Sequence, residues 1–153
     1  QSVVEDAVSN GFINYLGTTS DVLPIIGEAD CMVLPSYREG ISRVLMEAAS
    51  MEKPIIATNV TGCREVINDG ETGFLCKVKS PVDLAHKMAK IINMTEKEKV
   101  VMGQKGRVKV IEEMDLEKII DIYDYKIAAV LGEEEGITVD LQELISLRKT
   151  KKI

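Results

Sequence analysis

Residues 34–49 read LPSYREGISRVLMEAA, and this stretch predicts the end of a buried strand, a sharp polar turn and a helix. The turn holds one carboxylate, Glu39, and a second, Glu47, follows two turns into the helix. A helix N-terminus favours an anion, because its first amides lack intrahelical partners and lie at the positive end of the helix dipole. Both carboxylates are suited to accept hydrogen bonds from hydroxyl groups. The stretch is therefore a candidate site for an anionic ligand with hydroxyl groups on either side, such as a nucleotide sugar.

Short apolar segments alternate with helical patterns on both sides of this stretch. The predicted strands are Phe12–Leu16, Cys31–Leu34, Ile55–Thr58 and Gly73–Cys76. The predicted helices follow capping residues at Ser20 or Asp21, Ser80, Thr95 and Asp115, and residues 64–67 add a short one. Glycines at 103 and 106 are expected to weaken the helix after Thr95. The alternation predicts an α/β fold: a Rossmann-like parallel sheet of about four strands, flanked by helices, with further helices toward the C-terminal end.

The composition is typical of a globular domain that buries its own core. The net charge of −6 disfavours a broad nucleic-acid-binding surface. Three cysteines without a Cys-x-x-Cys pair and a single histidine disfavour both a disulfide framework and a structural zinc site. No apolar run approaches the roughly 18 residues of a membrane span. We therefore expect a cytoplasmic protein with no metal and no nucleic-acid partner.

The chain changes character after residue 131. Within residues 132–153, three consecutive glutamates follow Gly132, and a group of arginine and lysine residues lies near the end. This pattern predicts a weakly structured charged tail. Its basic end is a candidate contact with the cytoplasmic face of an anionic membrane.

Several short motifs follow one another in a definite order along the chain. They are Ala29-Asp30, Leu34-Pro35-Ser36, Glu39-Gly40 with Glu47 eight positions on, Lys53–Thr58, and Gly62–Ile67 followed by Gly70 and Gly73. This set, from about Gly17 to Leu131, resembles the glycosyltransferase family 4 group. The resemblance implies a GT-B fold, in which two Rossmann-like domains enclose the active site. It also implies retaining transfer of a sugar, without a metal or other cofactor, from a nucleotide-diphosphate donor to a saccharide or lipid-linked acceptor.

The resemblance implies roles for individual residues. Glu39 matches the carboxylate that contacts the donor-sugar hydroxyls and is the candidate catalytic residue, while Glu47 matches the carboxylate that holds the ribose. The backbone amides after Glu39 match those that lie against the sugar and diphosphate. The candidate donor-binding residues are Gly40, Ile41, Ser42, Arg43 and Glu47, and three further candidates are Ser36, Arg38 and Gly62.

The sequence of the turn differs from the commonest form of this motif in the family. It reads Glu-Gly-Ile-Ser-Arg over residues 39–43, where Glu-Gly-Phe-Gly is usual. Together with Gly62-Cys63-Arg64-Glu65, this variant resembles the branch that builds capsular, O-antigen and related surface polysaccharides. A UDP- or GDP-linked hexose or N-acetylhexosamine is the expected donor.

The family's donor-binding domain usually starts with two further βα units, which carry a basic pair that grips the diphosphate, and an acceptor-binding domain precedes them. Residues 1–131 are thus expected to be the later part of the C-terminal donor-binding domain. The isolated chain is expected to be inactive, and the acceptor-binding domain is an expected partner.

Two alternatives use the same α/β plan. One is a non-catalytic sugar-nucleotide-binding or protein-interaction module. The other, a phosphoacceptor receiver domain, is disfavoured because it needs an aspartate at the carboxyl end of a central strand, where this chain has Pro35-Ser36. Without the surrounding motifs, Glu39 and Glu47 are also compatible with ordinary surface carboxylates.

Overall fold

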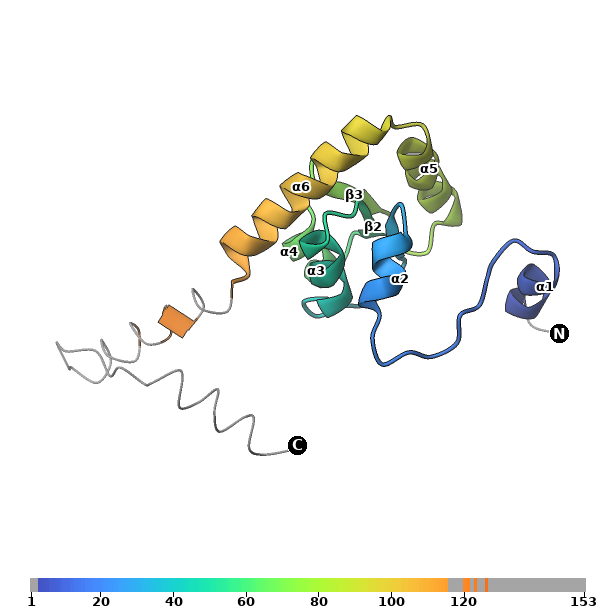
Figure 1. Ribbon diagram of the computed structural model, residues 1–153, viewed down its shortest axis with the longest axis horizontal. Helices are drawn as coiled ribbons and strands as arrows, with labels where there is room; N and C mark the ends of the chain where they lie inside the picture. The colour runs from blue at the N-terminus through green and yellow to red at the C-terminus, as the bar shows by residue number, and fades with distance from the viewer. Residues whose placement is uncertain (1–2, 116–119, 122, 124–125, 127–153) are drawn as a thin grey trace.

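The computed structural model describes residues 3–115, 120–121, 123 and 126, and a parallel three-stranded sheet lies at its centre (Figure 1). The strands are β1 (Met32–Leu34), β2 (Ile55–Thr58) and β3 (Gly73–Cys76), in the order β1-β2-β3. Val33, Ile56 and Phe74 lie side by side in the register of the three strands. Parallel strands place their carboxyl ends at one edge of the sheet, so the loops that follow them meet there.

Six helices are named in the described part of the chain. They are α1 (Val3–Ser9), α2 (Leu23–Glu28), α3 (Arg43–Ser50), α4 (Thr61–Val66), α5 (Pro81–Ile92) and α6 (Glu96–Glu113). The predicted caps are confirmed at two of them: the Asp83 amide donates to Ser80 Oγ at 3.3 Å, and Thr95 and Glu98 form a reciprocal capping box. At α2 the N-cap residue is Val22, which makes no side-chain capping hydrogen bond, and Asp21 lies one residue earlier, where its Oδ1 accepts from the Leu23 amide at 3.0 Å.

The core has one layer on each face of the sheet. On one face Ile55 and Ala57 pack with Leu45 and Ala48 of α3, and on the other Ile56 packs with Ile91 of α5. Neighbouring residues of β2 enter opposite layers because side chains alternate along a strand. The predicted α/β fold, a parallel sheet flanked by helices, is confirmed.

The predicted strand at Phe12–Leu16 is wrong. The chain there forms no strand with any described residue, and it runs away from the sheet between α1 and α2 (Figure 1). Phe12, Tyr15 and Leu16 are 81%, 72% and 62% exposed. A strand needs a hydrogen-bonded neighbour, and within the described residues β1 is paired only with β2. The described sheet therefore has three strands, where about four were predicted.

Two helices differ from the sequence prediction in detail. Helix α4 begins at Thr61, so it includes Gly62 and starts three residues before the predicted segment 64–67. Helix α6 is continuous through Gly103, although weakness was expected there. A Cβ atom at Gly103 would lie 1.8 Å from the Glu52 carbonyl oxygen, so glycine allows α6 to pack closely against the end of α3.

The last predicted elements fall mainly on residues that the structure does not describe. Most of the helix expected after Asp115 and the whole tail at 132–153 lie outside the described residues, although residues 120, 121, 123 and 126 are helical. None of the described helices has the length and apolar character needed to cross a bilayer.

Candidate functional site

Three loops meet at the carboxyl edge of the sheet. Residues 35–42 follow β1, residues 59–60 follow β2, and residues 77–80 follow β3. The Thr58 hydroxyl donates a hydrogen bond to the Ser36 carbonyl oxygen, which ties the first loop to the end of β2. The Asn59 amide donates to the Cys76 carbonyl oxygen at 2.8 Å, which ties the second loop to the end of β3. Ligands of open α/β sheets bind at this edge.

The first loop ends at an open helix N-terminus. Ser42, the N-cap residue of α3, is 5% exposed, and its backbone is extended. The amides of Leu45 and Met46 donate to the Ser42 carbonyl oxygen at 3.2 and 3.1 Å, which starts the helical hydrogen bonding. Ser42 makes no side-chain capping hydrogen bond, and the first turn of α3 contains no acidic residue. An anion in the loop would meet the positive end of the helix dipole without competition from such a cap.

Helix α4 packs against the Glu39-Gly40 turn at Gly62. A Cβ atom at Gly62 would lie 1.6 Å from the Gly40 carbonyl oxygen and 2.7 Å from the Glu39 carbonyl oxygen. Helix α4 can therefore pack directly on the Glu39-Gly40 backbone only because residue 62 has no side chain. By contrast, a Cβ atom at Gly40 would meet no atom within 4 Å, so the space above the turn is open.

Glu39 is half-buried and lies near a buried thiol. Cys63 of α4 is 0% exposed. Burial raises the pKa of Cys63, and the Glu39 carboxylate raises it further, while a hydrogen bond with the Thr58 hydroxyl opposes the rise. The thiol therefore stays protonated at neutral pH and is unsuited to be a nucleophile. Its contribution is to pack Thr58 and α4 beneath the turn.

Glu47 forms an ion pair one helical turn from the loop. Arg43 Nε lies 3.1 Å from Glu47 Oε1, and the two side chains are 89% and 26% exposed. Such exposed pairs contribute about 0 to 1 kcal/mol. Ligand hydroxyls can therefore replace the guanidinium at small cost, and the carboxylate is already positioned beside the start of α3.

The structure gathers some of the candidate residues and leaves others in solvent. The loop backbone from Ser36 to Ser42 and Gly62 are brought together, whereas the side chains of Arg38 and Ile41 are exposed. Sequence reasoning missed Thr58 as a supporting residue. Its position as the last residue of the neighbouring parallel strand was the available signal, because that position faces the same edge of the sheet.

A comparison with known families matches residues 9–109 of the chain to the model described as Glycosyl transferases group 1. The chain belongs to this family. N-acetyl-alpha-D-glucosaminyl L-malate synthase of Bacillus anthracis is 32% identical over 122 residues, which cover 80% of this chain and 32% of that protein. The N,N'-diacetylbacillosaminyl-diphospho-undecaprenol alpha-1,3-N-acetylgalactosaminyltransferase of Campylobacter jejuni is 33% identical over 85 residues, which cover 56% of this chain and 23% of that protein.

The fold of this chain matches solved structures as well. The crystal structure of Anabaena HepE in complex with UDP superposes with a TM-score of 0.74 at 20% identity, covering 83% of this chain and 36% of that one. The fold is that of part of a GT-B glycosyltransferase. The chain spans about a third of the length of the curated relatives that it matches first.

The described residues offer no ready metal centre. Within them, no three side chains of His, Cys, Asp or Glu gather closely enough to hold a metal ion. Metal-free transfer stays a prediction.

Proposed function

We propose that this chain supplies part of the nucleotide-sugar site of a retaining glycosyltransferase of family 4, as the later part of its donor-binding domain. The observation that carries the proposal is the Glu39-Gly40 turn. It rests on Gly62, it is open above Gly40, and it leads into the uncapped N-terminus of α3. This arrangement offers an anion site next to two carboxylates. Membership of the family Glycosyl transferases group 1 supports the binding of a nucleotide sugar at such a site.

The proposed roles follow from what each group can donate or accept. Glu39, the catalytic candidate, accepts hydrogen bonds from the donor sugar and stabilises positive charge that develops on it during transfer. The N-terminus of α3 with the amides of residues 40–42 stabilises the leaving diphosphate. Glu47 accepts the ribose hydroxyls, while Arg43 moves from Glu47 toward the phosphates. Ser36 and Arg38 are further candidates for polar contacts with the ligand.

The donor in this proposal is a UDP- or GDP-linked hexose or N-acetylhexosamine. The structural neighbour HepE binds UDP, which supports a uridine nucleotide. The acceptor is a saccharide or a lipid-linked saccharide of a surface polysaccharide pathway, used at the cytoplasmic membrane face. The name of the Campylobacter relative specifies a diphospho-undecaprenol acceptor and supports this choice, whereas the name of the Bacillus relative specifies malate.

In this proposal, sugar transfer requires parts of the protein that this chain does not contain. Because the chain spans about a third of its relatives, the acceptor-binding domain and the rest of the diphosphate site belong to other parts of the protein. The chain on its own then binds nucleotide weakly and transfers no sugar.

Two measurements test the proposal. In the isolated chain, titration with UDP and GDP should shift the NMR amide signals of residues 40–42, and Glu47→Gln should weaken binding several-fold. In the full-length protein, Glu39→Gln should lower the transfer rate by about a hundredfold or more. Glu71→Gln is the matched control, because Glu71 lies in the turn before β3, at the opposite edge of the sheet.

Unchanged binding and unchanged transfer in both variants would refute the assigned roles. Nucleotide binding with no transfer by the full-length protein would favour the non-catalytic module instead.

A further inference from the structure

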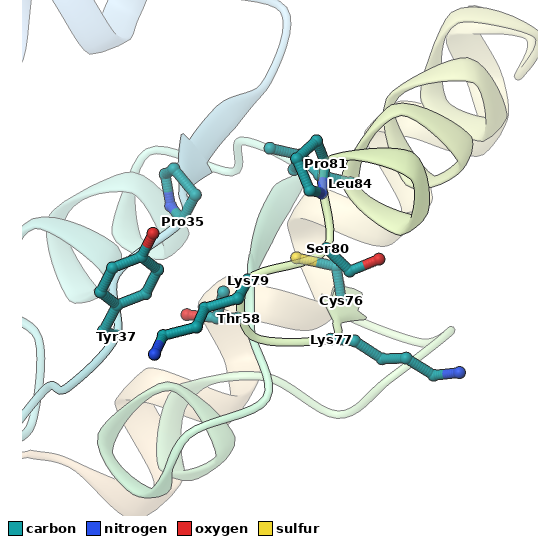
Figure 2. A pocket seen from close by; sticks show the side chains of 9 residues that line it. All are labelled: Pro35, Tyr37, Thr58, Cys76, Lys77, Lys79, Ser80, Pro81 and Leu84. Atoms are coloured by element: carbon teal, nitrogen blue, oxygen red, sulfur yellow. The ribbon is translucent and has the colours of Figure 1, made fainter.

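A pocket of about 380 Å³ lies beside the turn at the same edge of the sheet (Figure 2). Residues from all three strand ends line it, among them Tyr37 after β1, Thr58 at the end of β2, and Lys79 and Ser80 after β3. Leu84 of α5 closes one side, and it packs in the core layer opposite to that of α3. The pocket and the N-terminus of α3 therefore flank the turn from two sides.

The wall of this pocket combines an aromatic ring with a positive charge. Lys79 Nζ lies 5.5 Å from the centre of the Tyr37 ring, and Tyr37 is 63% exposed. Lys79 has a φ of 58°, which turns the chain between β3 and α5, and its side chain reaches toward Tyr37 (Figure 2). Among the described residues Lys79 forms no ion pair, so its charge is stabilised by a π-system and water and not by a carboxylate.

A second lysine in the same loop provides an internal comparison. Lys77 also borders the pocket, but its ammonium group points away from Tyr37 and Lys79 (Figure 2). Its backbone amide is bound to α5, since it donates to Asp83 Oδ2 at 2.7 Å. An anion in the pocket would thus meet Lys79 and not Lys77.

We propose that this pocket binds a phosphate-bearing saccharide, as the acceptor-side subsite next to the donor turn. The exposed Tyr37 ring packs against the sugar ring, and Lys79 pairs with the phosphate. Tyr37 precedes Glu39 by two residues, so a saccharide held here lies next to the donor sugar. The inference rests on the proposed function for its acceptor role and adds the place in this chain, and the two side chains, that bind the acceptor.

The experiment is an NMR titration of the whole 153-residue chain with N-acetylglucosamine 1-phosphate, N-acetylglucosamine, inorganic phosphate and UDP. The sugar phosphate should shift the amides of Tyr37, Thr58 and Lys79, and should do so equally in the presence of UDP. It should bind more tightly than either the neutral sugar or phosphate alone. Lys79→Gln should weaken its binding about tenfold, the effect of losing one charge-assisted hydrogen bond. Lys77→Gln, the matched control, removes the same charge from the same loop and should change binding less than about twofold.

Each other outcome overturns part of the inference. Equal losses in the two lysine variants would indicate a diffuse charge effect and no subsite. Equal binding of inorganic phosphate would reject the saccharide, and displacement by UDP would make the pocket part of the donor site. If UDP shifts the amides of residues 40–42 but the sugar phosphate shifts none, the inference fails and the proposed function stands. If UDP shifts none, the proposed function fails, and the acceptor role fails with it.

Discussion

The carboxyl ends of β1 and β2 lie side by side but carry different kinds of residue. After β1 come the groups offered to a ligand, such as Glu39 and Gly40, which are half-buried or exposed. After β2 come Gly62 and Cys63, which are buried, and the Thr58 hydroxyl that ends β2 is bonded to the first loop. The residues after β1 form the site, and the residues at the end of β2 and in α4 support its conformation. Substitutions in the two regions should therefore have different effects.

The strands themselves show the same contrast. Strand β1 is apolar throughout and β2 is apolar up to Thr58, yet β2 is fully buried and β1 is only half-buried. Strand β2 has a neighbour on each side, whereas β1 has one among the described residues. Burial is set by the neighbours that a strand acquires and not by its own apolar sequence.

The largest expected effect lies in the centre of the sheet. Ile56→Ala should destabilise the chain by about 3 kcal/mol, because it leaves a cavity at a site that is 1% exposed. Val33→Ala, at the paired position of half-buried β1, should cost about 1 kcal/mol. Urea unfolding of both variants measures the difference. Equal costs would show that β1 is as well packed as β2.

The next effect concerns the support of the turn. Gly62→Ala should destabilise by about 2 kcal/mol and should also abolish the UDP-induced shifts of residues 40–42, because its Cβ atom can fit only if the Gly40 peptide moves. Gly40→Ala should change stability by less than about 0.5 kcal/mol, since its Cβ atom would enter open space. Comparable stability losses in the two variants would contradict the packing described for α4.

A smaller effect is expected at the hydrogen bond between the two strand ends. Thr58→Val removes the donor to the Ser36 carbonyl oxygen and should cost about 1 kcal/mol. It should also broaden the amide signals of the first loop while leaving the core signals of α5 in place. Thr61→Val, on the exposed surface of α4, is the control for the same change in side chain. If Thr58→Val changes neither the stability nor the amide signals of the first loop, Gly62 alone supports the turn.

The smallest expected effect is a loss of stability at alkaline pH, which is absent at neutral pH. Burial raises the pKa of Cys31, just before β1, from 9.0 to about 11. The thiol is neutral in the folded protein where it would ionise in the unfolded chain, so its contribution to stability is complete below pH 9 and is lost between pH 9 and 11. The stability of the wild type should therefore fall more than that of Cys31→Ala between pH 8 and 10.5 in urea titrations. Parallel curves would show that Cys31 is as well hydrated in the folded state as in the unfolded chain.

Local patterns carried most of the fold prediction. The strands at 55–58 and 73–76, and the caps at Ser80 and Thr95, were predicted correctly because apolar runs and capping hydrogen bonds depend on neighbours in sequence. The segment at 12–16 had the same kind of apolar pattern but pairs with no strand in the described part of the chain. The error shows that an apolar segment becomes a strand only when a second segment pairs with it. The pattern of the first segment does not indicate whether such a second segment is available.

The sequence by itself determined the alternation of strands and helices, the turn that carries Glu39, the spacing to Glu47 and the family. Only the tertiary structure decided what holds that turn and what lies beside it. The contact of Gly62 with the Gly40 carbonyl joins residues 22 positions apart, and Lys79 meets Tyr37 across 42 positions. These contacts depend on the register and order of three parallel strands, which bring their carboxyl ends to one edge. No local preference along the chain encodes which loops will meet there.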